Sequence, residues 1–164
     1  MADRRPNGRT EADRSALACS IIDSSLYMVI ATADESGRPW ASPVYFAVED
    51  YRNFYWVSSL EAQHSRNIAM RPEVGIVVFD SGAEIGTGQG VYMEADAGLL
   101  SGAELDRGLS VFTVRSIGHG GSAWRSDDLD ETGLVRMYRA TASRYSMLAK
   151  DGRPDHRLSV DLPV

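Results

Sequence analysis

The sequence predicts a mainly β fold, a small antiparallel barrel of six or seven strands with about three short helices. The first observation is the apolar run of residues 27–33, which has the length of a strand and is bounded by polar residues. The second is a group of turn formers at residues 34–39, in which Gly37 is free to take a positive φ. The third is residues 135–147, which alternate well enough to form a long strand. Short strands joined by turns suit a small barrel, which closes its own sheet edges.

The first half of the chain predicts two helices and four strands. A helix begins at Thr10, an N-cap followed by acidic residues in the first turn. After the strand at 27–33, further strands are expected at 40–48 and 54–59. A short helix then follows from Leu60 to Met70 with Ser59 as its N-cap, and a β-branched run predicts a strand at 74–79.

The second half continues the β pattern around one more helix. Glycine-rich residues 82–90 are interpreted as a flexible entry into a strand at 88–96. Ser101 and Glu104 resemble a capping box, which predicts a helix after Ser101. Residues 117–126 form the most loop-like interior segment, and its glycines make it a candidate flap. The strand at 135–147 and a short final strand at 157–162 complete the barrel.

Length and composition predict one domain, residues 10–164, after a disordered tail at residues 1–9. No apolar run approaches the roughly 20 residues of a membrane helix, and the N-terminus lacks a signal-peptide core. Cys19 is the only cysteine, so no internal disulfide can form, which fits the cytoplasm. The net charge of −6 and the lack of a basic stripe argue against a nucleic-acid partner and favour a small-molecule substrate.

Groups that can hold an anion gather where the third expected strand meets the second helix. Ser58 and Ser59 end the strand, and His64, Ser65 and Arg66 follow on the helix. A helix N-terminus beside hydroxyls, an imidazole and a guanidinium is a suitable environment for a phosphate. This part of the sequence therefore indicates a phosphate-bearing cofactor.

The order of these motifs resembles that of the pyridoxamine 5'-phosphate oxidase-like split β-barrel flavoproteins. The matching segments lie in the same order as in that family, and they are residues 37–39 (Gly-Arg-Pro), 42–46, 55–59, 64–68 and 71–78. The resemblance implies a split barrel that forms a homodimer with flavin mononucleotide (FMN) in grooves at the interface. It also implies hydride transfer between the flavin and a small substrate, with the chemistry supplied by the cofactor.

The resemblance assigns expected cofactor contacts to four parts of the chain. The backbone of one strand lies along the flavin, the next strand ends in hydroxyl residues, the short helix binds the phosphate, and later residues add contacts. In this sequence the corresponding residues are Ser42, Pro43, Val44, Tyr45, Val57, Ser58, Ser59, His64, Ser65, Arg66 and Gln89, and the candidate flap adds Trp124 as a further expected contact. No catalytic residue is identified, and no metal site is expected.

The chain departs from the family at the phosphate-binding positions. Ser42, Gln63 and His64 stand where the family places cationic side chains. A neutral imidazole attracts a phosphate less strongly than an ammonium group does. We therefore expect that vitamin B6 phosphate is not the substrate, because it would require a second phosphate site.

Three alternatives remain open at the level of the sequence. Related barrels bind a deazaflavin instead of FMN. Others bind haem, for which His119 or His64 is a candidate axial ligand. The third alternative is a non-catalytic barrel that binds a ligand or nothing, consistent with the missing cations.

Overall fold

The computed structural model describes residues 10–129 and 134–163. The expected tail at residues 1–9 lies outside the described residues. In chain order the elements are α1 (Glu11–Ser24), β1 (Tyr27–Ala33), β2 (Pro39–Tyr45), β3 (Ala47–Glu49), β4 (Asn53–Ser58), α2 (Gln63–Met70), β5 (Glu73–Phe79), β6 (Gly90–Leu99), α3 (Gly102–Gly118), the 3₁₀ turn η1 (Ser126–Leu129), β7 (Arg136–Leu148) and β8 (Arg157–Ser159).

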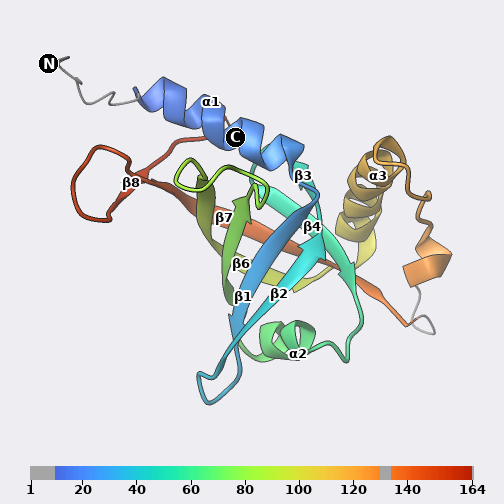
Figure 1. Cartoon of the computed structure of the whole chain (residues 1–164). Coiled ribbons are helices and arrows are strands. Elements are labelled where there is room, and N and C mark those ends of the chain that lie inside the picture. The colour runs from blue at the N-terminus through green and yellow to red at the C-terminus, as the bar shows by residue number, and fades with distance from the viewer. Residues whose placement is uncertain (1–9, 130–133, 164) are drawn as a thin grey trace, which may run out of the picture.

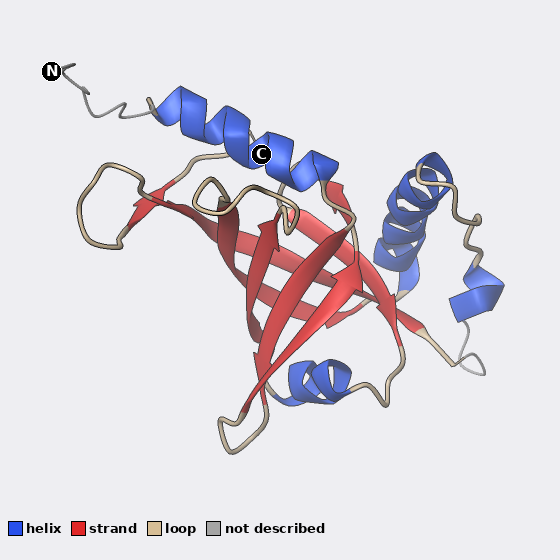
Figure 2. Ribbon diagram, viewed as in Figure 1, coloured by secondary structure: helices blue, strands red, loops and turns tan. Residues whose placement is uncertain are grey.

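The strands form one curled antiparallel sheet, which confirms the mainly β fold class. Seven strands follow the path β2-β1-β5-β6-β7-β4-β3, and β8 adds to β7 beside this path. The sheet bends into a half-barrel, with α1 across one end, α2 at the other end and α3 beside β4 (Figures 1 and 2). No helix of the described residues is long and apolar enough to cross a membrane.

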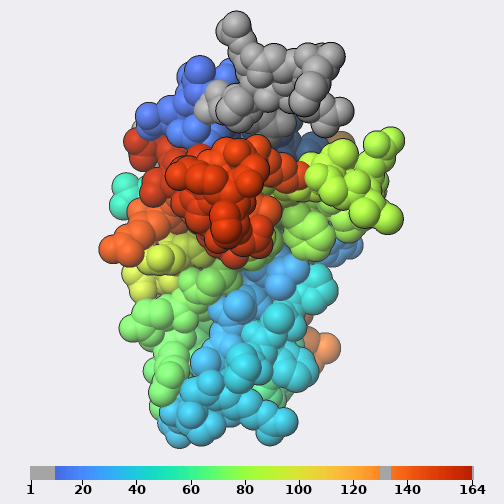
Figure 3. Space-filling view, turned by 60° about the vertical axis from the view of Figure 1, so that its left-hand side comes forward, coloured from blue at the N-terminus to red at the C-terminus, as the bar shows by residue number. Residues whose placement is uncertain are grey.

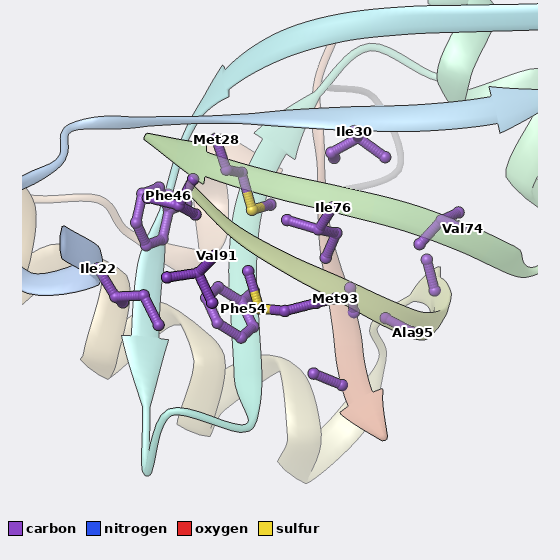
Figure 4. Packing of buried hydrophobic residues seen from close by; sticks show 14 of the residues in the cluster. Ile22, Met28, Ile30, Phe46, Phe54, Val74, Ile76, Val91, Met93 and Ala95 are labelled. Carbon is purple, nitrogen blue, oxygen red and sulfur yellow. The ribbon is translucent and has the colours of Figure 1, made fainter. Parts of the chain in front are cut away.

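The hydrophobic core fills the inside of this half-barrel. Alternate residues of each strand point inward, as the burial of Met28 and Ile30 on β1 illustrates. Figure 4 shows these side chains together with Ile76, Val91 and Met93 from the neighbouring strands. The strand predicted from the apolar run at residues 27–33 is confirmed, since β1 covers these residues.

A second cluster lies between the sheet and α3. Tyr55 on β4 points away from the barrel interior and packs with Leu100, Phe112 and Met137. Both faces of β4 are therefore buried, since its neighbours Phe54 and Trp56 belong to the barrel core. This packing fixes α3 against the sheet at the place where the site is formed.

The expected helix caps were only partly correct. Thr10 caps α1, and Asp13 completes a capping box with it. Ser59 does not cap α2, because residues 59–62 form a separate turn and the helix begins at Gln63. The Ser59 hydroxyl instead accepts a hydrogen bond from the Glu61 N–H.

The start and end of α3 also differ from expectation. Ser101 precedes the helix but makes no side-chain cap, and the Glu104 carboxylate contacts Arg139 at 2.8 Å instead. The helix continues to Gly118, so the expected loop at residues 117–126 is shorter and covers only residues 119–125.

Candidate functional site

A cavity of about 780 Å³ opens between β2, the end of β4, α2 and α3. Its volume falls in the range of small-molecule sites. The structure brings many of the residues expected from the sequence to its lining: Pro43, Val44, Tyr45, Val57, Ser58, His64 and Trp124.

His64 forms a hydrogen-bonded relay at the polar end of the cavity, which we call the inner end. Its Nδ1 lies 3.1 Å from the Ser42 hydroxyl, and its Nε2 lies 2.8 Å from the Ser58 hydroxyl. The Trp40 indole donates to Ser42 Oγ at 2.9 Å. Three elements thus meet here, because α2 places His64 between the serines of β2 and β4.

The donors and acceptors of this relay assign its protons. The Trp40 indole can only donate, and Ser42 is buried whereas Ser58 borders the cavity, so we assign the tautomer in which the Ser42 hydroxyl donates to His64 Nδ1. His64 Nε2–H then donates to Ser58 Oγ, which leaves the Ser58 proton for a ligand in the cavity. Burial lowers the pKa of the His64 imidazole, so the ring is neutral at pH 7.

Aromatic rings form the outer walls of the cavity. Tyr45 packs edge-on against Phe112 with ring centroids 5.5 Å apart, and Phe112 packs edge-on against Trp124 at 5.9 Å. Tyr27 continues the series beyond Tyr45 at 6.1 Å. These rings offer a large apolar surface to a flat ligand.

Tyr45 and His119 make the polar contact at the rim. The Tyr45 hydroxyl lies 2.9 Å from His119 Nδ1. Burial raises the pKa of Tyr45, so it is a neutral phenol at pH 7. The pair can therefore hold a proton at the edge of the cavity, where exposed His119 can exchange it with solvent.

The loop at residues 119–125 is tied to α3. The Thr113 hydroxyl contacts both the N–H and the C=O of Trp124, each at 3.1 Å. The Ser116 hydroxyl donates to the Ser122 carbonyl at 2.8 Å. These bonds hold Trp124 in the wall, so any flap motion of this loop must first break them.

The remaining expected contacts lie outside this cavity. Ser59 precedes α2, and Ser65 is a buried residue of α2 whose hydroxyl makes no hydrogen bond to a described residue. Arg66 faces a different hollow, where it contacts Gln63. Whether these residues touch a cofactor stays a prediction.

Gln89 belongs to a different part of the surface. It precedes β6, and its amide donates to the Leu148 carbonyl at 2.8 Å. The segment before β6 and the loop after β7 lie side by side there (Figure 3), joined also by Lys150 and the Gly86 carbonyl. Gln89 therefore does not reach the cavity within one chain.

Some lining residues were not expected from the sequence. Phe112 was assigned only to the apolar stripe of its helix, and Ser116 carried no signal. Neither residue could be found without knowing which face of α3 meets the open side of the sheet. Among the described residues, no three metal-ligating side chains gather into a possible metal site.

Solved structures share this fold at low sequence identity. A haem-binding protein from Mycobacterium smegmatis matches with a TM-score of 0.69 and 20% identity, over 92% of this chain and 58% of that protein. The haem storage protein HutZ from Vibrio cholerae matches with a TM-score of 0.61 and 18% identity, over 78% and 89%. An F420 reductase matches with a TM-score of 0.57 and 16% identity, over 77% and 94%.

The sequence itself matches a family model over most of its length. No match was found among curated proteins. The model described as pyridoxamine 5'-phosphate oxidase matches residues 18–159, which include every strand of the sheet and the residues that line the cavity. The chain therefore belongs to the pyridoxamine 5'-phosphate oxidase-like family of split β-barrels.

Proposed function

We propose that this chain is an FMN-dependent oxidoreductase that transfers hydride between the flavin and a small substrate. The observation that carries the proposal is the aromatic-walled cavity beside β2, with hydrogen-bonding groups at its inner end. A deazaflavin has the same general ring shape, so its identification is an outcome of the test below.

The residues of the cavity fit the ring of a flavin. Tyr45, Phe112 and Trp124 provide apolar and edge contacts to a flat heterocycle. β2 is an edge strand in the sheet order, so alternate backbone groups point away from β1. Phe46 N–H donates to the Leu26 carbonyl, so Val44, two residues earlier, also directs its N–H toward β1. Pro43 has no N–H, which leaves Tyr45 as the backbone donor that borders the cavity.

The protein would orient the ring and manage protons around it. The cofactor supplies hydride transfer when bound. Ser58 presents a hydroxyl proton to a ligand acceptor, and the aromatic walls exclude water from the ring. The Tyr45–His119 pair holds a proton at the rim of the cavity. A substrate that is reduced or oxidised there can exchange this proton with the pair.

Haem binding is the second candidate, and one observation favours it. His119 lies at the rim with an Nε2 that makes no hydrogen bond to a described residue, so this nitrogen is free to bind iron. His64 does not suit this role, because both of its ring nitrogens are bonded to serine hydroxyls. Two of the solved structures with this fold are described as haem proteins.

The functional unit is proposed to be a homodimer. Leu26 and Tyr27 line the cavity and are exposed, and Trp40 on the neighbouring strand is half exposed. Apolar groups of this size beside a ligand site support an interface that also closes the cavity. Sedimentation equilibrium should give twice the chain mass, and a monomer would contradict the proposal.

Location in the cytoplasm stays a prediction from the single cysteine.

The visible absorption spectrum of the purified protein tests the cofactor directly. We expect flavin absorption in the blue, and mass spectrometry of the released chromophore should identify FMN rather than a deazaflavin. An intense Soret band would instead support haem. If the protein is colourless, FMN is added and binding is followed by quenching of its fluorescence.

A pair of variants on α3 tests where FMN binds. Phe112→Leu keeps an apolar side chain but loses the ring, so FMN should bind more weakly by about 1 kcal/mol, or about fivefold. The matched control is Val114→Ala on the same helix, because Val114 is 72% exposed and lies outside the cavity. Equal affinities for the two variants would place FMN elsewhere, and no binding of FMN at all would refute the proposed function.

A further inference from the structure

The cavity contains no fixed charge. None of its described lining residues is Lys, Arg, Asp or Glu. Its ionisable groups are the two imidazoles, His64 at the inner end and His119 at the rim, and the phenols of Tyr27 and Tyr45. A phosphate dianion that enters this space therefore meets no permanent positive charge.

The side chains of the His64 relay are also neutral. Ser42 and Trp40 face it from β2, and Ser58 faces it from β4. Burial alone lowers the pKa of the imidazole, with no contribution from a charged side chain. Arg66 lies two residues further along α2, and Arg136 lies opposite Ser58 on β7, where it donates to the Val135 carbonyl at 2.9 Å. A bound anion would favour the imidazolium form.

The relay can hold the imidazolium without moving a heavy atom. After protonation, Nδ1–H donates to Ser42 Oγ, which has two lone pairs and can also keep the bond from Trp40. Nε2–H continues to donate to Ser58 Oγ, and the Ser58 proton still points to the ligand. The Ser42 hydroxyl must rotate away from Nδ1, and it then has no acceptor among the described residues, so the imidazolium forms only when a bound anion stabilises it.

We infer that the phosphate of FMN binds at the inner end together with one proton, which His64 takes up and holds. The inference rests on the proposed function, because it assumes that a flavin occupies the cavity. His64 then acts as a conditional cation, neutral in the free protein and charged beside the phosphate. Riboflavin, which has no phosphate, binds without this proton.

Calorimetry at pH 8 measures the proton directly. FMN is titrated into the protein in two buffers of different ionisation enthalpy, and riboflavin serves as the matched ligand. At this pH both free histidine and free phosphate are largely deprotonated, so uptake should be about one proton for FMN and about zero for riboflavin. The dissociation constant of FMN should fall about tenfold from pH 8 to pH 7, while that of riboflavin stays constant.

Two variants assign the proton to a residue. His64→Lys supplies a permanent cation, so uptake should fall to near zero and the affinity for FMN should lose its pH dependence. His119→Gln changes the other imidazole and should keep an uptake near one. Loss of the uptake in His119→Gln alone would overturn the assignment to His64.

Magnetic resonance on the unaltered protein distinguishes His64 from the phosphate as the carrier. Nitrogen shifts should show both ring nitrogens of His64 protonated in the FMN complex, and the phosphorus shift should remain that of a dianion. A monoanionic phosphate beside a neutral imidazole would overturn the inference. If both flavins bind without proton uptake, the inference fails while the proposed function stands, and if neither binds, the proposed function fails.

Discussion

The packing of α3 on β4 can be tested at one glycine. A Cβ added to Gly108 would lie 2.9 Å from Leu100 Cδ1 and 2.9 Å from Tyr55 Cδ1. The leucine methyl can turn aside, but the Tyr55 ring is buried and its hydroxyl donates to Glu49 at 3.0 Å. Arg107 in turn contacts Glu49 at 2.9 Å, so displacing the ring would disturb this whole arrangement.

Gly108→Ala should therefore destabilise the protein although alanine favours a helix. Overpacking costs about 1–3 kcal/mol, and the gain in helix propensity offsets about 1 kcal/mol of it. The control is Gly118→Ala in the same helix, where an added Cβ meets nothing within 4 Å.

Urea unfolding followed by circular dichroism compares the two variants. The free energy of unfolding should be lower for Gly108→Ala than for Gly118→Ala by about 2 kcal/mol, or about 4–8 °C in melting temperature for a chain of this size. Equal stabilities would refute the reasoning, because they would show that Tyr55 and α3 adjust without cost.

Three further predictions concern charge, the loop and the substrate. Hydrogen bonds from Arg107 hold the pKa of Glu49 below its usual 4.5. The pair therefore stabilises the protein at pH values above the pKa of Glu49 in the unfolded chain. This stabilisation is lost as the pH falls through the lower pKa of Glu49 in the folded protein. Glu49→Gln should therefore make the free energy of unfolding less dependent on pH below about 4.5, as measured by urea unfolding across acidic pH. Thr113→Val removes two bonds to Trp124, and hydrogen exchange at residues 121–125 should become about thirtyfold faster, at about 1 kcal/mol a bond; unchanged exchange would mean that the loop is held by other contacts. Oxygen consumption with pyridoxamine and pyridoxine phosphates should show no appreciable oxidation, and turnover near the enzyme median of ~10 per second would contradict this.

The strands were predictable because their signal is local. The apolar run at residues 27–33 and the turn that follows placed β1 and the approach to β2 correctly, and Gly37 takes the expected positive φ, at 86°. The caps were less predictable, since Ser59 and Ser101 each had a competing arrangement nearby. Glu104 bonds to Arg139, which is distant in the sequence, and no local pattern reveals such a partner.

Within the site, the sequence identified residue types but not their partners. The motifs marked Ser42, Ser58 and His64 separately as phosphate positions, and the order of the strands carried the family resemblance. Their direct contact depends on the register of β2 and on the placement of α2, which are set by packing across the sheet.

The sequence by itself determined the fold class and the family, because hydrophobic periodicity, turn residues and motif order are properties of neighbouring residues. Only the tertiary structure decided which side chains share the cavity. In the structure Arg66 lies at a different hollow, and Gln89 lies beside a distant loop. Phe112, which the sequence assigned only to the apolar stripe of its helix, lines the cavity. The orientation of a helix face and the closure of a sheet depend on contacts between distant segments, and these contacts left His64 as a neutral group in a cavity without fixed charge.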